Sequence, residues 1–86
     1  MPYVTQASRD TVENSGPELA GELNYAFTII INDYLKRHGL SYARVNDVIG
    51  AIECCKLELY RRLVGPYEDV KIKQNGDVYD EGLLSR

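Results

Sequence analysis

Residues 17–39, PELAGELNYAFTIIINDYLKRHG, hold a helix start, an apolar stripe and a helix stop, and they decide the fold. Pro17 suits the first position of a helix, and a carboxylate at Glu18 complements the positive end of the helix dipole. The last turn is basic, and Gly39 follows it as the expected cap. Between these signals apolar residues recur at three- and four-residue steps: Leu19, Leu23, Phe27, Ile30 and Tyr34. The stretch predicts a helix over residues 17–38.

A second helix is predicted over residues 42–64. Ser41 is a candidate N-cap, and Gly65-Pro66 gives the expected stop. The connection between the two helices is short, which predicts that they are antiparallel neighbours. The apolar stripe of the second helix contains Val45, Val48, Ile49, Ile52, Leu59 and Leu63.

The two ends of the chain lack the long helical pattern of its middle. Residues 1–16 are mostly polar, with few apolar residues and with Pro2 and Gly16 near the ends, which predicts a mobile arm with one short helical turn near residues 8–13. In VKIKQNGDVY, residues 70–79, Asn75-Gly76 suits a type I′ turn between alternating apolar and polar positions, which predicts a β-hairpin. The predicted fold is therefore mainly α, in one domain of residues 1–86. It is an antiparallel two-helix hairpin with a mobile N-terminal arm and a short C-terminal β-hairpin.

Both predicted helices have more apolar surface than one antiparallel neighbour covers. Ile29 and Ile31 flank the first stripe, while Cys54, Leu57 and Val64 lie off the second. A chain of this length buries only about 60–65% of the surface that its unfolded form exposes, so its core is small. Because a helix that is apolar on several faces is usually covered on several sides, we predict a homo-oligomer. The alternative is that the arm and the β-hairpin fold back over these faces.

Composition excludes several classes of function. The longest apolar run, residues 25–31, is far shorter than the ~20 residues of a membrane span. A net charge of −3 argues against general nucleic-acid binding, which depends on Lys and Arg. One histidine and two adjacent cysteines, Cys54 and Cys55, offer no tetrahedral metal spacing, and we expect both thiols to be reduced and buried. We predict no cofactor, no metal and no catalysis, and the absence of a secretory signal predicts the cytoplasm.

Positive charge and tyrosine are concentrated in the C-terminal half. The candidate ligand-binding residues are Lys56, Arg61, Arg62, Lys71, Lys73, Tyr60, Tyr67 and Tyr79. Arginine and lysine can hold an anion, and a tyrosine ring can stack on a base, so we predict a small anionic ligand, such as a nucleotide, between subunits. The alternative is that the cations form solvated ion pairs, such as Glu58 with Arg62, and that the tyrosines fill half-buried positions.

These residues predict a non-enzymatic binding module. A protein-interaction adaptor or inhibitor that acts on a host protein is the alternative function, together with a small assembly protein. A small hydrolase ranks third, because one histidine and ordinary spacing support no catalytic arrangement.

Three stretches carry a resemblance to a known family: GELNYAFTIIINDYL (21–35), GLSYARVNDVIGAIECCKLELYRR (39–62) and PYEDVKIKQNGDVY (66–79). With the opening MPY, they resemble a family of small proteins of uncharacterised function that is found in tailed-phage genomes and in some cellular genomes. The resemblance implies a viral or mobile-element origin and action in the cytoplasm of an infected cell. Small phage proteins of this kind often bind host factors or signalling nucleotides, or serve in assembly, which is an analogy at the level of the family.

Overall fold

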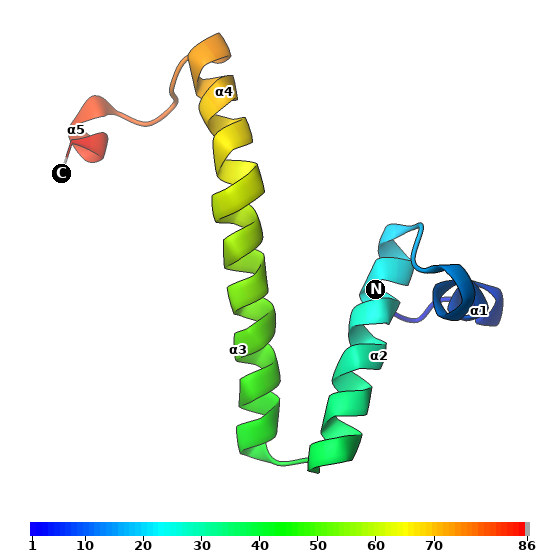
Figure 1. Cartoon of the computed structure of the whole chain (residues 1–86). Coiled ribbons are helices and arrows are strands. Elements are labelled where there is room, and N and C mark those ends of the chain that lie inside the picture. Colours follow the sequence, from blue (N-terminus) through cyan, green and yellow to red (C-terminus); the bar gives the residue numbers. More distant parts are fainter. Residues whose placement is uncertain (86) are drawn as a thin grey trace. The chain divides into compact units, whose positions relative to one another are not determined.

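The computed structural model describes residues 1–85, and helices make up most of them (Figure 1). The chain forms two compact units, Met1–Val48 and Ile49–Arg86. Residues 1–85 contain no β-strand. The elements in chain order are α1 (Gln6–Ser15), α2 (Ala20–His38), α3 (Tyr42–Leu59), the π-helix η1 (Tyr60–Val64), α4 (Gly65–Asn75) and α5 (Glu81–Leu84).

Helix α1 spans ten residues of the arm, so the helical segment predicted near residues 8–13 is present but longer than one short turn. Helix α1 begins at a side-chain cap, because the Thr5 hydroxyl accepts the N–H of Ser8 at 3.2 Å. It ends at Gly16, which has a positive φ of 93° and donates its N–H to the carbonyls of Thr11 and Val12. These caps satisfy backbone groups at both ends of the ten-residue helix.

Helix α1 and the residues before it pack on the first half of α2. The Arg9 guanidinium lies 5.5 Å from the centre of the Tyr25 ring, and its Nε donates to the Val4 carbonyl at 3.2 Å. A Cβ on Gly21 would lie 3.2 Å from Cγ1 of Val4, so the absence of a side chain there permits the close approach. The arm is therefore fixed by packing on α2.

Helix α2 begins three residues later than predicted, at Ala20. Leu19 has an extended backbone and is the N-cap residue. At the other end, Gly39 has a positive φ of 86° and donates its N–H to the Leu35 carbonyl, so the predicted stop at His38 is confirmed. Ser41 accepts the N–H of Arg44 at 3.2 Å through its hydroxyl, as expected of an N-cap.

Gly65-Pro66 does not end the helix that begins at Tyr42. Pro66 has no N–H, and its ring would clash with the carbonyl four residues earlier in a regular helix. The Gly65 N–H instead donates to the Tyr60 carbonyl, five residues earlier, which forms the wide turn η1. Pro66 then occupies the first turn of α4, where proline is tolerated. A Cβ on Gly65 would lie 3.3 Å from the Tyr60 carbonyl oxygen, which explains why glycine suits this position.

The predicted β-hairpin over residues 70–79 is absent, because residues 65–75 form α4. Asn75 is the last residue of this helix, and Gly76 caps it with a positive φ of 85° and an N–H donated to the Ile72 carbonyl at 2.8 Å. The positive φ that suggested a type I′ turn serves a helix cap equally well. A helix satisfies its backbone groups internally, whereas an isolated two-stranded hairpin is only marginally stable in water.

No apolar side chain is buried in residues 1–85, and the single buried residue there is Glu22. In the predicted apolar stripe of the first helix, four residues are exposed and Tyr34 is half-buried; the exposed ones are Leu19, Leu23, Phe27 and Ile30. The side of α2 that contacts α1 is a different one, which carries Gly21, Glu22 and Tyr25. Within Met1–Val48, the most regular apolar stripe of α2 is therefore left uncovered.

Candidate functional site

The residues predicted to bind a ligand are spread along one helical run and do not converge. Lys56 lies on α3, whereas Lys73 lies near the end of α4. A helical rise of 1.5 Å per residue separates these two residues by about 25 Å along the axis. Between them, Tyr60, Arg61 and Arg62 lie on η1, and Tyr67 and Lys71 lie on α4; Tyr79 follows α4. This distribution exceeds the length of one small ligand.

Two of the predicted cations already have carboxylate partners in the same chain. Lys56 Nζ lies 3.1 Å from Glu53, and Arg61 Nη2 lies 3.0 Å from Glu58. The sequence predicted Arg62 as the partner of Glu58, whereas the structure pairs Glu58 with Arg61 at a three-residue spacing. Both pairs are exposed, where such contacts contribute about 0–1 kcal/mol, so an anion competes with Glu53 and Glu58 for these cations.

The structure brings one predicted lysine onto one predicted tyrosine. Lys71 Nζ lies 5.6 Å from the centre of the Tyr67 ring and donates a hydrogen bond to Gln74 Oε1 at 3.4 Å. The two residues are one helical turn apart on α4, which places their side chains on the same face. A lysine of the same chain therefore already contacts the Tyr67 ring.

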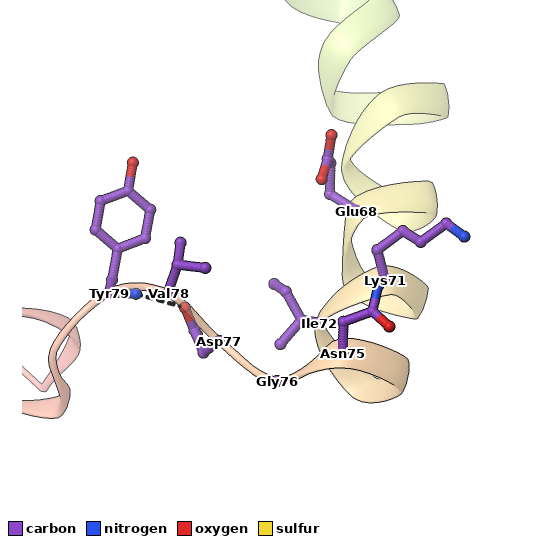
Figure 2. A pocket seen from close by; sticks show the side chains of 8 residues that line it. All are labelled: Glu68, Lys71, Ile72, Asn75, Gly76, Asp77, Val78 and Tyr79. Carbon is purple, nitrogen blue, oxygen red and sulfur yellow. Dashed lines mark hydrogen bonds between the residues drawn. The ribbon is translucent and has the colours of Figure 1, made fainter.

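A shallow groove of about 460 Å³ lies between the last turns of α4 and the segment that follows it (Figure 2). In this segment, Asp77 Oδ1 accepts the N–H of Tyr79 at 3.0 Å, which holds a local turn (Figure 2). The groove is lined by Glu68, Lys71, Ile72, Asn75, Gly76, Asp77, Val78 and Tyr79. Two carboxylates and one lysine line it, so its charge does not favour an anion.

Two of the predicted site residues, Lys71 and Tyr79, line this groove together, which the sequence did not predict. The β-hairpin prediction also missed Ile72 and Asp77 as groove residues. A strand places alternate residues on one face, whereas a helix places residues three and four apart on one face. The spacing of Glu68, Lys71, Ile72 and Asn75 is the helical signal that would have found the α4 side of the groove.

Helix α3 and η1 expose a second regular apolar surface, which we name the α3 face. It consists of Ile49 (59% exposed), Ile52 (48%), Leu59 (51%) and Leu63 (67%). These residues lie in the unit Ile49–Arg86 and recur at helical spacing, so they share one side of the helix. Exposed apolar patches of this kind are typical of interaction surfaces.

The cysteines are placed differently from the prediction. Cys54 and Cys55 are free and exposed, so the expectation of buried thiols is wrong. In residues 1–85 no group of three or more His, Cys, Asp or Glu side chains is placed to hold a metal ion. None of the helices in these residues has the length and apolar character of a membrane span.

Glu22, the buried carboxylate, is a residue whose role the sequence analysis missed. Its Oε1 accepts the N–H of Glu18 at 3.0 Å and that of Leu19 at 3.3 Å. The hydrogen bond from the Glu18 N–H, followed by those from the Ser8 side chain and the Leu19 N–H, lowers the pKa of Glu22 against the opposing effect of burial. Glutamate at the third position of a helix is the sequence signal for this capping role.

Comparison with known proteins identifies a family for this chain. A family model described as a domain of unknown function (DUF6899) matches residues 1–78. No curated protein and no solved structure matches the chain.

Proposed function

The chain belongs to the family described as a domain of unknown function (DUF6899), and we propose that it is a non-enzymatic interaction module that works as a homo-oligomer. The observation that carries the proposal is the absence of any buried apolar side chain in residues 1–85, although apolar residues recur at helical spacing on α2 and α3. Apolar burial is the main favourable contribution to folding and to association. Within each of the two units these faces are open, so a second copy that covers them gains that contribution.

The size of the two faces is consistent with this role. The α3 face has four apolar residues, and the stripe on α2 has four more: Leu19, Leu23, Phe27 and Ile30. Full burial of such a side chain contributes roughly 1.5–3 kcal/mol, so covering the exposed half contributes about 1 kcal/mol for each residue. Eight residues per chain therefore supply a contribution on the scale of the association cost, which is about 4–15 kcal/mol.

Light scattering coupled to gel filtration tests the proposal on the full chain. We expect a mass that is a multiple of the 9.7 kDa chain at tens of micromolar, because two or more copies cover the exposed faces. A monomer mass at that concentration would overturn the homo-oligomer. Capture of one host protein by such a monomer would support the alternative of an adaptor or inhibitor.

Binding of a small anionic ligand is the weaker proposal, because Lys56 and Arg61 have carboxylate partners and the groove after α4 is acidic. A thermal-shift screen with nucleotides and inorganic phosphate tests it. A ligand at 100 times its dissociation constant stabilises a protein by about 2.7 kcal/mol, and we expect none of these probes to approach that value. A large increase in melting temperature that disappears in Arg62→Glu, with the oligomer mass unchanged, would support the anion site.

A phage origin and a cytoplasmic location belong to the same proposal. They are supported by the resemblance of the three stretches between residues 21 and 79 to a family found in tailed-phage genomes. An interaction module of this kind acts inside the infected cell. Detection of the chain in the soluble fraction of infected cells would agree with this, and its recovery with the membrane fraction would contradict it.

A further inference from the structure

The α3 face has the spacing of a coiled coil. When position 56 is included, its residues alternate between steps of three and four along the sequence: Ile49, Ile52, Leu59 and Leu63. In a heptad repeat Ile49, Ile52 and Leu59, which lie on α3, take apolar a and d positions, and Leu63 follows on η1. All of them belong to the unit Ile49–Arg86, so the pattern depends on α3 and η1 alone.

A lysine interrupts this seam at its centre. Lys56 occupies the a position between Ile52 and Leu59, and its Nζ lies 3.1 Å from Glu53, which flanks the seam. A single lysine at an a position lowers the stability of a coiled coil but selects its register and partner. The positive charge of Lys56 therefore distinguishes between the possible orientations of a second helix on the α3 face.

We propose that α3 pairs with α3 of a second copy of this chain as an antiparallel two-stranded coiled coil. This inference rests on the proposed homo-oligomer and names its interface. In a parallel pair, a positions meet a positions, so the two Lys56 ammonium groups face each other in the seam. Like charges at that distance repel, more strongly as water is excluded.

The antiparallel arrangement removes this repulsion. With Ile49 opposite Leu59 of the partner subunit, Ile52 lies opposite Lys56 of the partner subunit, and the two-fold axis repeats both contacts. Each Lys56 then lies beside Glu53 of the partner subunit, which is adjacent to Ile52 in sequence. The ion pair that forms within one chain at 3.1 Å is thus available between chains. Charge complementarity selects a second copy in this orientation.

Cross-linking between two single-cysteine variants tests the orientation. Ile49→Cys and Leu59→Cys are made separately in the full chain with Cys54→Ser and Cys55→Ser, then mixed and oxidised. We expect the disulfide that joins the two different variants to form at least tenfold more than either homodimer. Predominant homodimer disulfides would show a parallel pair and overturn the inference.

A second pair of variants tests the seam without changing its apolar residues. Lys56→Glu and Glu53→Lys each place like charges across the interface, so each alone should associate at least tenfold more weakly, while their mixture regains the original affinity. If both variants keep the oligomer mass of the unchanged chain, α3 is not the interface, although the proposed homo-oligomer stands. If the unchanged chain is itself a monomer, the inference and the proposed function both fail.

Discussion

Replacing Ile52 by lysine is expected to abolish self-association at tens of micromolar and to raise the dissociation constant at least a hundredfold. Ile52 lies in the middle of the α3 face and is 48% exposed, so pairing with a second copy buries the remainder of its side chain. A lysine there loses the apolar contribution and faces Lys56 of the partner subunit, so like charges meet in the seam. The hundredfold change corresponds to about 2.8 kcal/mol, and analytical ultracentrifugation measures it.

Leu57→Lys is the matched control, because the same helix carries Leu57 at a similar exposure of 57%. Five residues along a helix rotate the side chain by about 140° relative to Ile52, away from the α3 face. We expect its mass to match that of the unchanged chain, and circular dichroism should show equal helical content in both variants. Equal loss of association in the two variants would mean that general apolar exposure drives assembly and that the α3 face does not.

Replacing Glu22 by glutamine is expected to detach α1 from α2. The carboxylate accepts two backbone N–H groups and a hydrogen bond from Ser8 on α1, and it is the buried side chain of this unit. An amide side chain forms weaker hydrogen bonds with these donors, because it has lost the negative charge. We expect protection of the α1 amides from hydrogen exchange to fall at least tenfold. Glu18→Gln is the control, because Glu18 contributes its backbone N–H and its side chain is exposed.

The same contact should weaken in acid. The pKa of Glu22 is lowered from an ordinary value of 4.5, so the folded arrangement favours the ionised carboxylate. The stability that it contributes is fully present above pH 4.5 and is lost as the pH falls through the lower, folded-state pKa. The NMR shifts of α1 followed on acidification check this. In Glu22→Gln the acid transition should disappear, and an unchanged transition would assign it to another group.

Local signals in the sequence determined much of the helical architecture. The basic last turn and Gly39 end α2 where predicted, and Ser41 caps the start of α3. Asp33 and Arg37 form their four-residue ion pair at 3.1 Å. These features depend on residues within about one turn of each other, so the sequence alone contains the information that places them.

The candidate site was only partly predictable. Its basic and aromatic residues were identified by type, but the neighbours of Lys71 and Tyr79 depend on whether residues 70–79 form strands or a helix. A period of two predicted Lys71 and Lys73 on one face, whereas the helix places Lys71 near Tyr67 and lines the groove with Glu68. The groove is acidic because helical spacing, in place of the two-residue period of a strand, brings Glu68 into it.

Two dipeptides had more than one possible structure, and contacts beyond the local sequence decided between them. Gly65-Pro66 ends a helix in many proteins, but the Tyr60 carbonyl accepts the Gly65 N–H and carries the chain into α4 through a wide turn. Asn75-Gly76 suits a hairpin, but the Gly76 N–H reaches the Ile72 carbonyl and caps a helix. The packing of α1 likewise depends on Glu22 and Tyr25 of α2. Sequence fixes the conformations that glycine and proline allow, whereas the available hydrogen-bond partners select one of them.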